Sequence, residues 1–146
     1  MNKEEFDAVV ISLEVDTQPC LFLLLCKDGT VNRLGTGTLD NSEKALFVGE
    51  SLAPFFKQFM ARVNNELLDN AGAYRHPDPK GRPCKLVLAF RRPKDPLGFE
   101  FHFGTESEGP PAEVSSLVSF ATQMTEEWYA HQKEDVAAQA NEEEEA

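Results

Sequence analysis

The hydrophobic positions of residues 6–15 alternate with polar ones, which is the period of a half-buried β-strand. In residues 6–15, FDAVVISLEV, every second side chain lies on one apolar side of the strand. These side chains are Val9, Ile11, Leu13 and Val15. Residues 20–26, CLFLLLC, are apolar on both faces and predict a strand that is central in its sheet or covered on both sides. Residues 30–37, TVNRLGTG, predict a third strand.

The connection between the second and third strands is centred on Asp28-Gly29. This dipeptide is favoured in two-residue type I′ turns, because both turn positions need positive φ. The register predicted from this turn opposes Lys27 to Thr30, Cys26 to Val31, Leu24 to Arg33, Leu23 to Leu34 and Phe22 to Gly35.

Gly35 and Gly37 raise the question of a phosphate-binding loop. The stretch lacks the Gly-Lys-Ser/Thr ending of a P-loop, and Asp40 stands where a dinucleotide motif needs its third glycine. We therefore expect these glycines to mark a bulge or the point where the strand leaves the sheet.

Residues 52–71 predict one amphipathic helix, with Ser51 as its cap and Gly72 as its stop. Its apolar positions recur at helical spacing and are Leu52, Phe55, Phe56, Phe59, Met60, Val63 and Leu67. We expect this stripe to pack on the sheet. Residues 40–51 stay ambiguous between a short helical turn, capped by Asp40 or Ser42, and a brief extended segment.

Residues 73–83, with three prolines, predict the longest loop of the chain. A strand at residues 84–92 and a strand at residues 97–104 follow, joined by a short Pro-Lys-Asp-Pro turn. If Arg92 opposes Leu97, then Leu86, Leu88 and Phe90 share a face with Phe103, Phe101 and Phe99. The other face then gathers Arg91, Glu100 and His102.

Residues 106–132 predict a second long helix that opens at Pro110-Pro111. Its stripe contains Val114, Leu117, Val118, Ala121, Met124 and Trp128. After Lys133 the sequence is rich in alanine and glutamate, so we expect the helix to fray into a disordered acidic tail.

These elements predict a single α+β domain over residues 1–133 with an acidic tail over residues 134–146. The domain is expected to hold an antiparallel sheet of about five strands in the order strand, strand, strand, helix, strand, strand, helix, with both helices on one face. The two-sided apolar strand at residues 20–26 leaves two alternatives. Either a second apolar surface serves dimerisation, or the sheet curls round its own interior.

Charge is unevenly distributed over the 146 residues, whose formal net charge is −11. Residues 134–146 carry six acidic and no basic residues, and residues 75–94 carry seven basic residues against Asp78, giving +6. The rest of the surface is acidic, which disfavours nucleic-acid binding by long-range attraction. The longest apolar run has seven residues and the first ten residues include acidic ones, so we expect no membrane span and a cytoplasmic protein.

Cys20, Cys26 and Cys84 lie in or beside apolar strands and predict reduced, mostly buried thiols. Cys84 borders the basic segment and follows His76 by eight residues. Its surroundings therefore come closer to those of a nucleophilic cysteine than the surroundings of Cys20 or Cys26 do. The three histidines are scattered and no metal-binding motif occurs, so we expect no metal and no cofactor.

Two groups of residues are candidate binding sites. The predicted loop contains Arg75, His76 and Arg82, which suit a phosphate or an acidic protein surface. The trio of Arg91, Glu100 and His102 suits acid-base chemistry or an anion. We assign no catalytic residue.

The leading functional hypothesis is a protein-binding or adaptor domain without catalysis, which meets another protein through the sheet or a helix face. One form is an inhibitor or immunity-type protein of a basic enzyme. The alternative is a small enzyme or anion-binding domain built on Arg91, Glu100 and His102. A pocket that joins these three side chains to residues 75–83 is the observation that would favour the alternative.

Overall fold

The computed structural model describes residues 3–38 and 43–145. In these residues the chain forms seven strands, and a 3₁₀ turn at Lys3–Glu5 precedes them. The strands are β1 Ala8–Val15, β2 Gln18–Cys26, β3 Thr30–Leu34, β4 Leu46–Glu50, β5 Gly72–Arg75, β6 Pro83–Arg91 and β7 Leu97–Gly104. The helices are α1 Phe55–Met60, α2 Asn65–Leu68, α3 Ala112–Met124 and α4 Glu126–Glu145.

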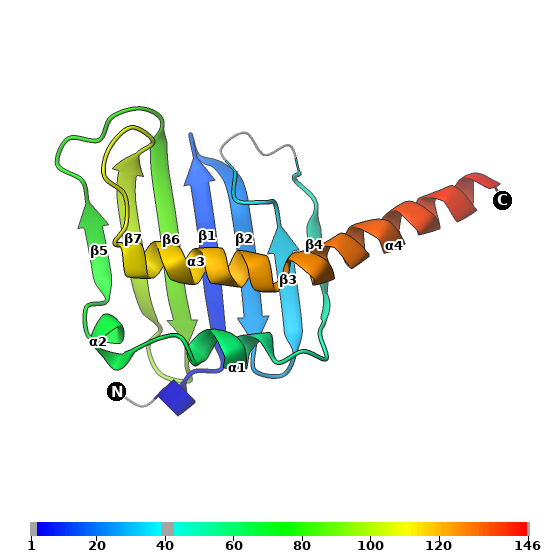
Figure 1. Cartoon of the computed structure of the whole chain (residues 1–146), viewed down its shortest axis with the longest axis horizontal. Coiled ribbons are helices and arrows are strands. Elements are labelled where there is room, and N and C mark those ends of the chain that lie inside the picture. The colour runs from blue at the N-terminus through cyan, green and yellow to red at the C-terminus, as the bar shows by residue number, and fades with distance from the viewer. Residues whose placement is uncertain (1–2, 39–42, 146) are drawn as a thin grey trace.

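All seven strands join one sheet in the order β4-β3-β2-β1-β6-β7-β5 (Figure 1). The α+β class is confirmed, and the five predicted strands correspond to β1, β2, β3, β6 and β7. The sheet is mixed because β5 pairs in parallel with β7, whereas the other neighbours are antiparallel. The other two are short edge strands: β5 was not predicted, and β4 corresponds to the extended segment that was one of two alternatives for residues 40–51, whose possible helix caps Asp40 and Ser42 lie outside the described residues.

Residues 73–83 were expected to be a loop, but their first part belongs to β5. This edge strand is exposed along its whole length, so no buried alternation marks it in the sequence. Backbone pairing holds it, and the ring of Tyr74 stacks on Phe101 of β7 with 5.3 Å between centroids. Arg75 therefore lies in a strand and not in a flexible loop.

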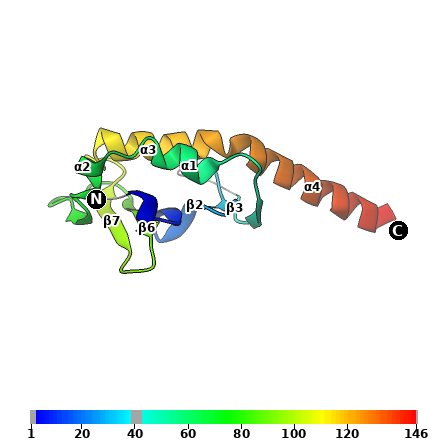
Figure 2. The ribbon, with the colours of Figure 1, turned by 90° about the horizontal axis from the view of Figure 1, so that it is seen from below.

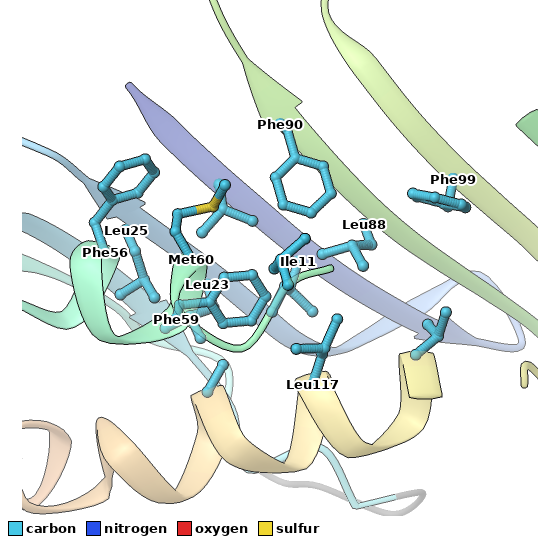
Figure 3. Close-up of a cluster of buried hydrophobic side chains, with 14 of the residues drawn as sticks. Ile11, Leu23, Leu25, Phe56, Phe59, Met60, Leu88, Phe90, Phe99 and Leu117 are labelled. Atoms are coloured by element: carbon cyan, nitrogen blue, oxygen red, sulfur yellow. The ribbon is translucent and has the colours of Figure 1, made fainter. Parts of the chain in front are cut away.

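The helices cover one face of the sheet (Figure 2). Between the two layers lies the core shown in Figure 3, which includes Ile11, Leu23, Leu25, Phe56, Phe59, Met60, Leu88, Phe90, Phe99 and Leu117. The period-two alternation predicted for residues 6–15 is confirmed, since Val9, Ile11 and Val15 are buried. β1 lies centrally because it pairs with both β2 and β6.

The hairpin between β2 and β3 differs from the prediction by one residue. Lys27–Gly29 form a three-residue connection in which Gly29 alone has positive φ, at 100°, whereas a type I′ turn needs positive φ at Asp28 as well. The register is consequently Leu25 to Val31, Leu24 to Asn32, Leu23 to Arg33 and Phe22 to Leu34. A shift of one residue moves a side chain to the other face. Arg33 therefore lies on the helix side.

The register between β6 and β7 differs from the prediction by two residues, which preserves the faces. The pairs are Phe90 with Leu97, Leu88 with Phe99, Leu86 with Phe101 and Cys84 with Phe103. The predicted apolar face of this hairpin is thus confirmed, while the positions along the strands are displaced.

The single helix predicted over residues 52–71 is two short helices. α1 begins after Pro54, and α2 begins after Asn64, whose side chain accepts a hydrogen bond from the Leu67 amide. Asn64 has extended backbone angles, because an asparagine that caps a helix start cannot also continue the preceding helix. The predicted stripe is nevertheless buried at Phe56, Phe59, Met60, Val63 and Leu67, whereas Leu52 is fully exposed.

The second predicted helix is divided at Thr125 into α3 and α4. α4 continues past the β4 edge of the sheet (Figure 1) and is helical to Glu145, where the sequence predicted a disordered tail. Alanine, glutamate and glutamine have high intrinsic helix propensity, which favours this extension without packing. The domain boundary at residues 133 and 134 stays a prediction.

Candidate functional site

The face of the sheet opposite the helices forms one side of the described chain (Figure 2). No helix within the described residues covers it, and we call it the open face. Two rows of paired positions cross its centre. The first row is Leu46, Leu34, Phe22, Ser12 and Val87, and the second is Val48, Asn32, Leu24, Val10, Ala89 and Gly98. We call these two rows the apolar band.

The apolar band is most exposed at the sheet edge, where Leu46 is 50% and Val48 is 61% accessible. Within the band the side-chain oxygen of Asn32 is buried and has no hydrogen-bond partner among the described residues. A polar atom in this state is uncommon in folded proteins. The apolar character predicted for both faces of residues 20–26 thus corresponds to a sheet with one uncovered face.

Charged side chains border the apolar band on β6 and β7. Glu100 accepts hydrogen bonds from Lys85 at 3.2 Å and lies 3.0 Å from His102 Nε2. The Lys85 hydrogen bond, with that of His102, holds the pKa of the Glu100 carboxyl below its usual value. Lys85 therefore occupies the place that the sequence analysis gave to Arg91.

Arg91 lies on the open face but apart from Glu100 and His102. It pairs with Ala8 of β1, whereas Glu100 pairs with Val87, four residues earlier along β6. Four residues of strand span roughly 13 Å. The predicted trio is therefore not assembled, because the two-residue change of register moves Arg91 along the strand.

The basic residues that follow Tyr74 face different groups. His76 donates its backbone N–H to the carbonyl of His102, and its Nδ1 accepts a hydrogen bond from the Asp78 amide. Arg82 forms an ion pair with Asp16, with 2.6 Å between Nε and Oδ2. The structure brings Arg75, His76 and His102 together around one pocket, while Arg82 lies elsewhere.

That pocket, of about 550 Å³, lies between the β5–β7 edge of the sheet, α2 and the start of α3, and we call it the aromatic pocket. Its apolar lining comes from Leu67, Tyr74, Phe99, Phe101, Phe103 and Val114. Its polar lining includes Glu66, Asn70, Arg75, His76, His102, Glu108 and Glu113. The volume is within the range of pockets that bind small molecules. Neither Arg91 nor Glu100 lines it.

Arg33 is a buried residue that the sequence analysis did not single out. Its guanidinium donates hydrogen bonds to the carbonyls of Gly35 and Thr122, to the Thr125 hydroxyl and to the Glu126 carboxylate. The helix-facing row in which it lies runs through Phe47, Arg33, Leu23, Ile11, Leu88 and Phe99. A buried charge needs such partners, so Arg33 fixes β3 to the junction of α3 and α4.

Tyr129 extends this polar cluster towards Glu43. Its ring lies 4.2 Å from the Arg33 guanidinium carbon, and its hydroxyl donates to Glu43 at 2.6 Å. Burial, together with the Glu43 hydrogen bond, raises the pKa of Tyr129 to about 12. The same hydrogen bond, with Lys133, lowers the pKa of Glu43. All these groups satisfy one another, which indicates a structural role rather than an open site.

The cysteines do not form a reactive site. All three are in the thiol form; Cys20 and Cys84 are buried and Cys26 is partly buried. Cys20 lies at a bulge in β2 and packs with Val15 and Cys84. Burial raises the pKa of the Cys84 thiol, which makes the nucleophilic thiolate less available.

The chain matches no protein-family model, no curated protein and no solved structure. In the described part of the chain no helix is both long and apolar enough to cross a bilayer. No group of three or more histidine, cysteine, aspartate or glutamate side chains there is arranged to hold a metal ion.

Proposed function

We propose that the chain is a non-catalytic protein-binding domain that binds through its open face. The apolar band carries this proposal. Monomeric proteins in water rarely expose a contiguous apolar patch of more than a few hundred Å², and larger patches are typical of interaction sites. The unsatisfied oxygen of Asn32 adds support, because a partner that covers the band supplies a donor once the amide reorients.

The open face is large enough for a stable interface. Six strands from β4 to β7 lie about 4.8 Å apart and span roughly 24 to 29 Å, and their lengths give an area on the order of 600 Å². Stable interfaces bury about 600 to 1,000 Å² on each partner. The open face reaches this range when its polar margins take part.

The occupant that we propose is a second copy of the chain. An apolar centre bordered by charges is typical of interfaces between identical subunits. A two-fold axis that lies in the interface, perpendicular to the strands, places β4 on β4 of the second copy and the apolar band on itself. Two sheets with the same twist also pack well face to face.

The competing function, an enzyme or anion-binding domain built on Arg91, Glu100 and His102, has less support. Such a function needs one pocket that joins all three side chains. Of the three residues, His102 lines the aromatic pocket, and Arg91 and Glu100 do not. Glu100 is engaged with Lys85 and His102 on the open face.

Multi-angle light scattering of the purified full chain and two variants tests the proposal. Val48→Glu introduces a charge at an exposed position of the apolar band. Leu52→Glu makes the same kind of change at an exposed leucine that is outside the open face. We expect the natural chain and Leu52→Glu to have twice the mass of one chain at micromolar concentration, and Val48→Glu to have the mass of one chain.

Circular dichroism shows whether Val48→Glu remains folded, as expected for a substitution at an exposed edge. A single-chain mass for the natural protein at every concentration, or a Val48→Glu variant that stays paired, would overturn the proposal.

A further inference from the structure

The floor of the aromatic pocket is a row of parallel rings. Phe101 stacks on Tyr74 with an interplanar angle of 14° and on Phe99 with an angle of 4°. The Tyr74 hydroxyl donates to the carbonyl of Asn70, which fixes the ring at the mouth of the pocket. Leu67 and Val114 complete the apolar lining from α2 and α3. The pocket thus offers an apolar slot with aromatic walls.

The rim of the aromatic pocket is mainly acidic. Three carboxylates come from three separate segments: Glu66 from α2, Glu108 from the connection before α3, and Glu113 from the first turn of α3. Arg75 is the one arginine among the described residues that line the pocket. At neutral pH the rim therefore has an excess of negative charge.

The two histidines that line the pocket have their imidazoles engaged elsewhere. His76 uses Nδ1 as an acceptor for the Asp78 amide, and His102 uses Nε2 with Glu100 on the open face. Glu113 accepts a hydrogen bond from the Asn64 amide. Glu66 and Glu108 are the exposed carboxylates best placed to meet an incoming ligand.

We infer that the aromatic pocket binds a positively charged group on an apolar stem, such as a lysine or arginine side chain of a basic protein or a free organic ammonium ion. The stem lies over the row of rings, against Leu67 and Val114, and the charge meets the carboxylates of the rim. A cation near aromatic rings gains further attraction from their electron-rich faces. The net charge of −11 draws such ligands towards the protein.

This inference goes beyond the proposed function, because the aromatic pocket and the open face are different surfaces. The pocket would be a second contact, through which the acidic protein recognises a basic partner.

Amide chemical shifts of the isotope-labelled full chain test the inference. 2-Phenylethylammonium is the cationic probe, and 3-phenylpropionate is an anionic probe of similar size. We expect the cation to shift the amides of Tyr74, His76 and Phe101 in a saturable manner and the anion to bind at least several-fold more weakly. A capped peptide with lysine between two phenylalanines, compared with its norleucine analogue, distinguishes a protein side chain from a free amine.

The double variant Glu66→Gln/Glu108→Gln removes two charges of the rim at nearly constant shape. We expect it to weaken binding of 2-phenylethylammonium by about 3- to 10-fold, since exposed ion pairs contribute modestly. Glu127→Gln is the matched control, because this carboxylate is exposed on α4, is absent from the pocket lining and should leave binding unchanged.

Equal or tighter binding of 3-phenylpropionate would overturn the inference in favour of an anion site at Arg75. An absence of shifts around the pocket with both probes and both peptides would also overturn it. Light scattering of the double variant keeps the two proposals apart, since loss of the pocket ligand leaves pairing through the open face intact.

Discussion

The buried guanidinium of Arg33 donates a hydrogen bond of 3.1 Å to the hydroxyl of Thr125, at the point where α3 gives way to α4. Both residues are inaccessible to water. The Thr125 hydroxyl also donates to the carbonyl of Ala121. A strand and a helix junction that are far apart in sequence are therefore joined through one side-chain oxygen.

Thr125→Val should destabilise the protein, because it leaves a buried guanidinium N–H without its acceptor. The expected loss is about 1 to 3 kcal/mol of the free energy of unfolding, measured by urea denaturation. Thr122→Val is the control, since the Thr122 hydroxyl donates to the Val118 carbonyl within α3 and makes no bond to Arg33. Equal losses for the two variants would contradict the role given to Thr125.

The Tyr129 phenol should make the free energy of unfolding fall as pH rises through the alkaline range. Its pKa is about 12 in the folded chain and near 10 when unfolded, so the unfolded chain loses its proton first as pH rises. The stabilisation from this group is complete below pH 10 and is lost between about pH 10 and 12, amounting to at most about 2 to 3 kcal/mol. The measurement is the difference in unfolding free energy between the natural chain and Tyr129→Phe across this range. A difference in unfolding free energy that stays constant between about pH 10 and 12 would contradict the raised pKa of Tyr129.

Asn64→Ala should destabilise the chain by about 1 kcal/mol, because α2 loses its N-cap and the backbone N–H of Leu67 loses its hydrogen-bond acceptor. Asn65→Ala, at the next position, removes no cap and should change the unfolding free energy by less than about half that amount. Thermal denaturation of both variants provides the comparison. Similar melting temperatures would show that the cap does not divide α1 from α2.

Gly104→Ala should be strongly unfavourable, since a Cβ at this position would collide with the backbone of Lys80. We expect a loss of about 1 to 3 kcal/mol and faster amide exchange at Glu106, whose N–H donates to the Lys80 carbonyl. Gly98→Ala is the control on the same strand, where the added Cβ would make ordinary contact with Ala89. A Gly104→Ala variant as stable as Gly98→Ala would contradict the close approach.

The sequence predicted which side chains share a face within one strand, because these are determined by a period of two. It predicted registers poorly, because these depend on details of the turns. The conformation of Asp28 changed one register by a residue and placed Arg33 in the core. The pattern Val31-x-Arg33 did contain a signal, since an arginine in phase with a buried valine needs buried partners.

Among the candidate site residues, the sequence identified Arg75, His76 and His102, which do line one pocket. It did not predict the carboxylates Glu66 and Glu108 beside them. Glu66 precedes Arg75 by 9 residues and lies in a different helix-bearing segment, and Glu108 follows His102 by 6 residues in the connection before α3, so only the packing of these segments on β7 brings the carboxylates to the pocket. The open face was anticipated as one of two alternatives by the two-sided apolar strand at residues 20–26.

Methyl NMR with a soluble paramagnetic agent shows whether a second copy covers the open face. In the purified chain, the methyl groups of Val48 and Leu24 should be broadened less as protein concentration rises and pairs form, while those of Leu52 stay fully broadened. Broadening of Val48 that equals that of Leu52 at every concentration would show that the open face stays uncovered and that the chains do not pair through it.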